Sequence, residues 1–149
     1  MDPQQHFAAL ERMYRAGPIN RLYRPEITVT DGEAVVEMEV SEDFFHAGRS
    51  LHGSVYFKML DDAAFFAANS REREVFVLTA SFATRFRRPV TGGRLKAVGK
   101  IIGAEGGRYR AEAALFDESG TRVAEGSGVF ARSRMPLTEA MGYAEPGFP

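Results

Sequence analysis

Two adjacent acidic residues, Asp61 and Asp62, lie in the middle of a segment that is otherwise almost entirely apolar. The segment runs from His52 to about Asn69, and an apolar pattern on all sides is typical of a buried helix. Burying an unpaired carboxylate is costly, so each acid must be paired or used in chemistry. Apolar surroundings raise the proton affinity of a carboxylate, which suits a general base near neutral pH.

The start of the same helix offers a second chemical element. Free backbone N–H groups at a helix N-terminus, aided by the helix dipole, can stabilise negative charge on a carbonyl oxygen. Gly53 would let a ligand approach this backbone closely, because it has no side chain. Ser54 is predicted to cap the helix.

The alternative to chemistry for the two acids is an ion pair. Lys58 lies three residues before Asp61 and four before Asp62, so one salt bridge is available. Adjacent residues on a helix point about 100° apart, so the two acids cannot share one role. We expect one of them to be functional and the other to be paired or exposed.

The elements that position these residues can be read from the rest of the chain. Asp31-Gly32 and the run from Asp117 to Gly120 are hairpin signals. The helical spacing of Phe7, Leu10, Met13 and Tyr14 predicts an amphipathic helix over Pro3–Ala16, with these four side chains on its apolar face. The strands are predicted at Pro25–Thr30, Glu33–Val40, Val75–Pro89, Arg94–Ile102, Arg108–Phe116 and Thr121–Arg132. Along the third of these, one face should carry Phe76, Leu78, Ala80, Phe82, Thr84 and Phe86.

This order of elements predicts an α+β fold. Hairpin-linked strands favour a curved antiparallel sheet wrapped around a long central helix, which is the hotdog architecture. We expect a single hotdog domain over residues 1–149, with an N-terminal helix at about 3–16, a core at about 25–132 and a C-terminal extension at 133–149. A second subunit usually covers the outer face and edge strands of such a sheet, which predicts a homodimer or a homotetramer.

Composition narrows the class of protein further. The chain has 149 residues and a formal net charge of -1, which argues against a general nucleic-acid binder. It has no cysteine, so disulfides, thiolate metal sites and a Cys nucleophile are excluded. No signal peptide or membrane-spanning run is visible, and we expect a cytoplasmic protein that engages no membrane.

Two motifs resemble those of a known family. The segment HGSVYFKMLDDAAFFAANS is similar to the HGG-x6-D-x-A signature of hotdog-fold acyl-CoA thioesterases of the PaaI type, within the 4-hydroxybenzoyl-CoA thioesterase superfamily. The later TASFATRFRRPV resembles their second strand, which ends in an aromatic-x-R-P motif. The resemblance covers roughly residues 35–132. It implies hydrolysis of a short, medium-chain or aromatic acyl-CoA thioester at a dimer interface.

The resemblance also implies roles for individual residues. The backbone N–H at the position of Gly53 polarises the thioester carbonyl, and His52 precedes it in the motif. Asp61 matches the acid that acts as general base or nucleophile, from the subunit that faces the His-Gly pair. The Ser or Thr on the following strand matches Thr79; a β-branched strand filler is the alternative. Ser54 stands where the family has its second Gly, and we expect it to contact substrate.

His46 stands where the family often has an Asn that helps to place water. It could position water, act as a base, or lie solvated on a loop. His52 could orient the helix start through a hydrogen bond or transfer a proton. No metal is expected, because the spacing of His46, His52 and Asp61 matches no common zinc motif.

Three arginines end the strand before Pro89. Arg87 and Arg88 are expected to meet the phosphates of coenzyme A, since guanidinium groups suit phosphate, although a solvated charge run is the alternative. Arg85 shares a face with Arg87 but not with Arg88. Coenzyme A is part of the substrate, and no other cofactor is expected.

Two other functions remain open at this point. A hotdog hydratase or dehydratase also pairs a loop His with a helix acid, and His46 with Asp61 could imitate that pair. A non-catalytic acyl-CoA binding domain would fit the replaced Asn. No helix-turn-helix segment is visible that would link such a domain to DNA.

Overall fold

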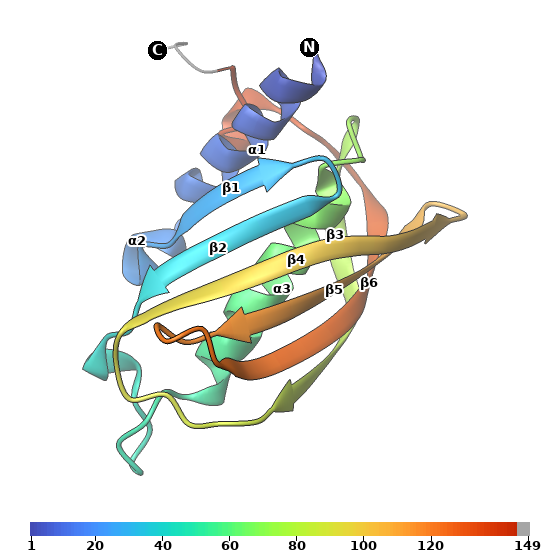
Figure 1. The fold of residues 1–149 in the computed structure, drawn as a ribbon. Helices are drawn as coiled ribbons and strands as arrows, with labels where there is room; N and C mark the ends of the chain where they lie inside the picture. The colour runs from blue at the N-terminus through green and yellow to red at the C-terminus, as the bar shows by residue number, and fades with distance from the viewer. Residues whose placement is uncertain (146–149) are drawn as a thin grey trace.

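The computed structural model describes residues 1–145, which form a six-stranded antiparallel sheet curved around a long helix (Figure 1). The predicted α+β hotdog architecture is confirmed. The helices are α1 (Pro3–Ala16), α2 (Asn20–Tyr23) and α3 (Gly53–Asn69), with short 3-10 turns at Glu42–Phe44 and Glu139–Met141. The strands are β1 (Glu26–Thr30), β2 (Glu33–Glu39), β3 (Val75–Phe86), β4 (Arg94–Glu105), β5 (Arg108–Phe116) and β6 (Arg122–Pro136).

The strand order β1-β2-β4-β5-β6-β3 places β3 at one edge of the sheet. All neighbouring pairs are antiparallel, and β3 is paired with β6 alone within the described chain. Both predicted hairpin turns form, with Gly32 and Gly120 in the left-handed region at φ 71° and 85°. The outer edge of β3, twelve residues long, is therefore left without a partner strand in one chain.

The central helix α3 supplies much of the core, as its apolar sequence predicts. Eleven of its side chains are buried, and they pack against apolar residues of β2, β4, β5 and β6. The backbone of α3 at Ala63 and Ala64 comes so close to β4 that a Cβ added at Gly99 would lie 2.2 Å from the Ala63 carbonyl oxygen. Small residues on both sides thus set the distance between helix and sheet.

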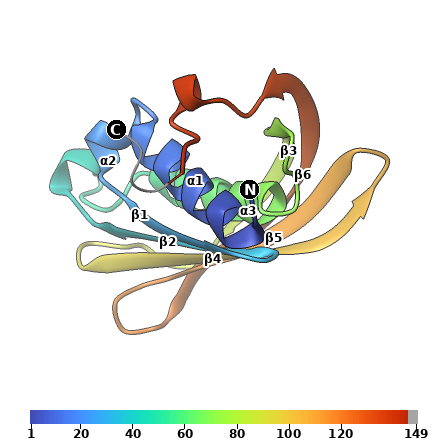
Figure 2. The same cartoon turned by 90° about the horizontal axis from the view of Figure 1, so that it is seen from above.

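The N-terminal helix α1 lies on the same side of the sheet as α3 (Figure 2). Asp2 and Gln5 form a capping box at its start. Two features of this region were not predicted from the sequence. The short helix α2 follows α1, and the segment after β6 returns across α1, where the Tyr143 hydroxyl lies 2.7 Å from Nδ1 of buried His6.

Several predicted strand limits are wrong. β3 ends at Phe86 rather than at Pro89, whereas β4 continues to Glu105 and β6 to Pro136. The C-terminal extension predicted from residue 133 therefore begins inside a strand, and its residues 146–149 lie outside the described chain. Long antiparallel neighbours support each other beyond the point where the apolar alternation of each strand stops.

The single apolar face predicted for β3 is also wrong. Val77 is fully buried, whereas Leu78 is 47% exposed. Register shifts against β6 at Val75/Val77 and at Thr79/Ser81 change which side chains point toward α3. Val77 and Thr79 share the side of β3 that faces the helix, and beyond the second shift the ring of Phe82 packs against Phe130 of β6.

Candidate active site

Asp61 is a half-buried carboxyl group in the middle of α3. Its Oδ1 accepts a hydrogen bond of 2.9 Å from the Thr79 hydroxyl on β3. Burial raises the pKa of Asp61 to about 6, and the Thr79 hydrogen bond opposes this rise. The carboxyl group can therefore take up and release a proton close to neutral pH.

The contact between Thr79 and Asp61 leads to a test. In Thr79→Val the Asp61 carboxylate loses its hydroxyl donor, so its pKa should rise by about 0.5–1 unit. Carbon-13 NMR titration of the aspartate carboxyl groups measures this pKa directly. Thr84→Val is the matched control, because the buried Thr84 hydroxyl has no hydrogen-bond partner within residues 1–145. An unchanged Asp61 pKa in Thr79→Val would mean that the hydrogen bond is too weak to matter.

Asp62 does not face the same way as Asp61. Its Oδ2 forms an ion pair of 2.6 Å with Lys58 and accepts a hydrogen bond of 2.7 Å from the Tyr14 hydroxyl of α1. The ion pair that the spacing made available thus forms with Asp62 and leaves Asp61 to Thr79. The sequence did not reveal the role of Tyr14, because its position fits the apolar face of α1.

The N-terminus of α3 has a different cap from the predicted one. His52, rather than Ser54, is the N-cap: its Nδ1 accepts a hydrogen bond of 3.1 Å from the Ser54 N–H. The Ser54 hydroxyl lies 2.8 Å from the same nitrogen. The imidazole reaches over the first turn, where a serine was expected to do so. The N–H of Gly53 donates to no acceptor among the described residues.

His46 lies on the loop before α3, with both ring nitrogens engaged by that loop. Nδ1 accepts a hydrogen bond of 2.9 Å from the Gly48 N–H, and Nε2 lies 3.0 Å from the Ser50 hydroxyl. The loop therefore fixes the orientation of the imidazole relative to the helix start. Its ring is aligned by its own loop rather than by Asp61.

A cleft of about 350 Å³ opens beside the start of α3. It brings together four of the residues singled out in the sequence: His46, Gly53, Arg87 and Arg88. Asp61 lies further along α3, where Thr79 of β3 contacts it. The residues lining it are His46, Ser50, Leu51, Gly53, Tyr56, Phe86, Arg87, Arg88 and Pro89. Phe86 was missed as a site residue: a Cβ added at Gly53 would lie 3.3 Å from its ring. The aromatic-x-R-P motif carried this signal, although the sequence analysis gave Phe86 only a place on the apolar face of its strand.

The two arginines of this cleft have different surroundings. Arg87 forms an ion pair with Glu125 of β6, and this raises the pKa of the guanidinium group. Arg88 forms no ion pair within residues 1–145, and its carbonyl oxygen accepts a hydrogen bond of 2.8 Å from the Tyr56 hydroxyl. Arg88 is therefore the arginine whose guanidinium group is better placed to meet an anion.

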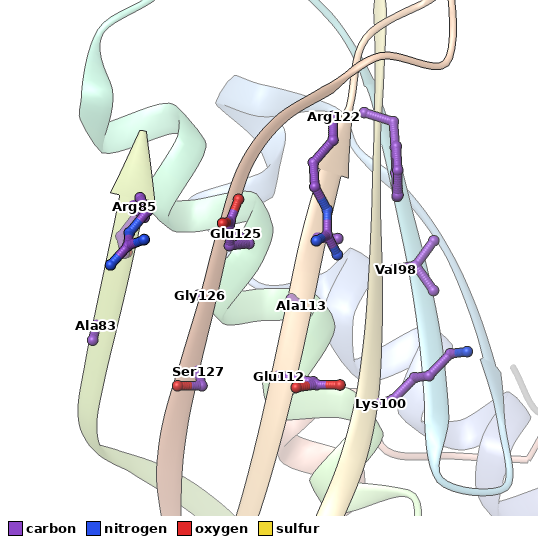
Figure 3. A pocket seen from close by; sticks show the side chains of 13 residues that line it. Ala83, Arg85, Val98, Lys100, Glu112, Ala113, Arg122, Glu125, Gly126 and Ser127 are labelled. Atoms are coloured by element: carbon purple, nitrogen blue, oxygen red, sulfur yellow. The ribbon is translucent and has the colours of Figure 1, made fainter. Parts of the chain in front are cut away.

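A larger hollow of about 690 Å³ lies on the face of the sheet turned away from α3 (Figure 3). Strands β3, β4, β5 and β6 line it, with charged side chains around small ones. Arg85 points into this hollow rather than toward the cleft. None of the predicted catalytic residues contributes to it.

The described residues hold neither a metal-binding cluster nor a membrane-spanning helix. Among residues 1–145, no group of three or more His, Cys, Asp or Glu side chains is arranged to hold a metal ion. The helices of this part of the chain are also too short or too polar to cross a membrane.

Solved structures share this fold. The PaaI protein from the phenylacetic acid degradation operon of E. coli superposes with a TM-score of 0.80 at 22% identity, covering 90% of this chain and 99% of that chain. A mutant of PaaI from Thermus thermophilus gives 0.71 at 24% identity, over 78% and 99% of the two chains. S. sahachiroi AziG gives 0.74 at 24% identity, over 83% and 100%.

Sequence comparison identifies the family. No curated protein sequence is significantly similar to this chain. The family model "Thioesterase superfamily", however, matches residues 48–124, more than half of the chain. The match includes the start of α3, Asp61, Thr79 and the arginines that follow β3. The chain belongs to the thioesterase superfamily, with the hotdog fold also seen in PaaI structures.

Proposed function

We propose that this protein is an acyl-CoA thioesterase with Asp61 as its base or nucleophile. The observation that carries the proposal is the Asp61 carboxyl group, half-buried, hydrogen-bonded to Thr79 and with a pKa raised to about 6. Membership of the thioesterase superfamily supports the reaction type. A second support is the N–H of Gly53, which offers a donor for the developing oxyanion.

The general-base form of the reaction needs a base, a water molecule and a hydrogen-bond donor for the oxyanion. Asp61 takes a proton from a water molecule, whose oxygen attacks the thioester carbonyl carbon. Negative charge then collects on the carbonyl oxygen, where the Gly53 N–H and the dipole of α3 stabilise it. The carbon–sulfur bond breaks, coenzyme A leaves as the thiolate, and the proton held by Asp61 returns to the products.

These parts cannot act together within one chain. Gly53 and Asp61 are eight residues apart on α3, which corresponds to about 12 Å along a helix. One carbonyl group cannot contact both at hydrogen-bonding distance. We therefore propose a homodimer in which Asp61 of one chain faces Gly53 of the other. The unpartnered edge of β3, next to Thr79, is the natural place for two copies to pair.

The dimer proposal predicts the behaviour of one variant. Leu78 on β3 is 47% exposed in a single chain, and Leu78→Lys would put a charge into the proposed interface. We expect its mass by light scattering to fall from twice the 16.5 kDa of one chain to that of one chain. Leu22→Lys is the control, because Leu22 is 64% exposed on α2. A wild-type protein that is already monomeric would contradict the proposal.

The acyl group is proposed to be short or aromatic. Phe57, one turn before Asp61, is 41% exposed and packs edge-on to Phe82 at 5.6 Å. Phe86, beside Gly53, is 54% exposed. Large exposed rings on both sides of the site favour a compact or planar acyl chain. Arg88 is the proposed phosphate contact for coenzyme A, while Arg87 remains paired with Glu125.

Thiol release from short, medium, long and aromatic acyl-CoA esters tests the function. A thiol-reactive dye is suitable, because the protein has no cysteine of its own. We expect kcat/KM to rise with pH and to reach half of its plateau near pH 6, since Asp61 must be deprotonated to act as a base. Hydration of crotonyl-CoA without thiol release would instead indicate a hydratase. Binding of acyl-CoA without turnover would indicate a binding domain.

A further inference from the structure

A small cluster of polar groups lies next to Asp61 in the sequence, where α3 contacts the N-terminal helices. It consists of Lys58 and Asp62 of α3 and Tyr14 of α1, with the ring of Tyr23 of α2 beside it. Asp62 Oδ2 accepts from Lys58 Nζ at 2.6 Å and from the Tyr14 hydroxyl at 2.7 Å. The Lys58 Nζ also lies 5.3 Å from the ring centroids of both Tyr14 and Tyr23. The side chains of Lys58 and Asp62 are only 12% and 18% exposed. This ion pair is thus shielded from solvent on several sides.

The cluster holds a carboxylate at a fixed distance from the candidate base. Asp61 and Asp62 are neighbours in sequence, one held by Thr79 on β3 and the other by Tyr14 on α1. Neither side chain can swing away without breaking a hydrogen bond. Charges act more strongly on each other where protein rather than water lies between them. The charge on Asp62 therefore acts on Asp61 partly through protein, and its counterion Lys58 opposes that effect.

We propose that the Tyr14–Lys58–Asp62 cluster is a positioning device that acts through Asp61: it fixes a negative and a positive charge beside this carboxyl group, and the two charges act on it in opposite directions. This inference rests on the proposed function in one respect, namely that Asp61 is the group that takes the proton. The family match covers residues 48–124 and does not include α1. Tyr14 therefore reaches the cluster from a helix outside the matched segment.

The signs of the charge effects agree with this proposal. Burial raises the pKa of Asp61, the Thr79 hydrogen bond lowers it, the charge of Asp62 raises it and that of Lys58 lowers it. These groups, from α3 and β3, are the ones that act on Asp61 within residues 1–145. From α1, Tyr14 acts on Asp62, and burial together with Asp62 raises the pKa of its phenol. The phenol therefore stays protonated and remains a donor.

Two substitutions should shift the titration midpoint of Asp61 in opposite directions. Asp62→Asn removes the negative charge and leaves Lys58, so the midpoint of the Asp61 titration should fall by about 0.5–1 pH unit. Lys58→Gln leaves the charge of Asp62 without its counterion, so the midpoint should rise by a similar amount. The double variant should lie close to the wild type. Each substitution keeps an amide that can replace the lost hydrogen bond, so the fold should be retained.

The opposite signs separate this role from a structural one. Both single variants lose the same ion pair, so a structural role would shift the midpoint in the same direction in both, or in neither. Arg71→Gln is the control, because it removes the remote exposed ion pair between Arg71 and Asp31. It should leave the Asp61 midpoint unchanged. Shifts of one sign, or no shift, in the Asp62 and Lys58 variants would overturn the proposal.

Two measurements keep this test apart from the test of function. Carbon-13 NMR of the carboxyl groups follows Asp61 without any turnover, with its signal assigned by its loss in Asp61→Asn. The acidic limb of kcat/KM follows the same group during catalysis. If the Asp61 titration midpoint moves in opposite directions in the two variants but the protein hydrolyses no thioester, the charge coupling is upheld and the proposed function is rejected. Hydrolysis without opposite shifts would reject the charge coupling alone.

Discussion

Asparagine in place of Asp61 should lower kcat/KM for thioester hydrolysis by about 10²–10⁴-fold, the range that general-base catalysis contributes. The amide has nearly the same shape as the carboxyl group and can still accept a hydrogen bond from Thr79, but it cannot take up a proton. A role as nucleophile would give a loss of at least this size, since an amide oxygen attacks poorly. Initial rates of thiol release with the best acyl-CoA substrate provide the measurement.

The stability of the same variant should move in the opposite direction from its activity. The pKa of Asp61 is higher in the folded chain, at about 6, than the ordinary value of 3.8. Such a carboxyl group lowers the free energy of unfolding as the pH rises from about 4 through 6. At pH 7, Asp61→Asn should therefore be more stable than the wild type by about 1–2 kcal/mol, after allowance for solvent screening.

Urea unfolding at pH 4 and at pH 7 distinguishes this effect from a general change in packing. The gain in stability of Asp61→Asn over the wild type should be present at pH 7 and nearly absent at pH 4. At pH 4 Asp61 of the folded wild type is still protonated, so its ionisation has hardly lowered the free energy of unfolding. Asp31→Asn is the control for replacing an exposed aspartate, and its activity should stay within about twofold of the wild type. Full activity in Asp61→Asn would remove Asp61 from the mechanism.

The sequence predicted the parts of the fold that depend on local patterns. Asp31-Gly32 marked a hairpin because a tight turn there needs a positive φ, which Gly32 adopts. The helix around Asp61 was found close to its observed limits, Gly53–Asn69, because its sequence is almost entirely apolar, although its N-cap is His52 rather than the expected Ser54. The strand order, with β3 at an edge, was not predicted, since pairing between distant segments leaves no local signal.

The candidate site was predicted in its residue types but not in its contacts. The pattern placed Asp61 and Gly53 on one helix, yet it did not show that Thr79 would reach the carboxyl group. Thr79 shares the helix-facing side of β3 with buried Val77, whereas the apolar pattern had assigned that side to Phe76 and Leu78. Tyr14 was interpreted as an apolar residue of α1, because a phenol on such a face gives no sign of its hydrogen-bond partner.

The distance between α3 and the sheet determines where Asp61 lies, and Gly99 sets that distance. A Cβ at Gly99 would lie 2.2 Å from the carbonyl oxygen of Ala63 and 2.6 Å from the backbone nitrogen of Ala64. Both atoms belong to the helix backbone, so no side chain can rotate to make room. Gly99→Ala therefore has to push the central helix away from β4 or distort the strand.

We expect Gly99→Ala to lose about 3 kcal/mol or more in the free energy of unfolding, at the upper end of the cost of overpacking. Native proteins usually have a free energy of unfolding of about 5–15 kcal/mol. Part of the Gly99→Ala protein should therefore remain folded at low temperature. Its activity should also fall, since Ala63 lies only two residues after Asp61. Gly103→Ala on the same strand is the matched control, because nothing lies within 4 Å of its added Cβ. Equal stability of the two variants would mean that the helix can move away at little cost, and that Gly99 does not fix the position of the base.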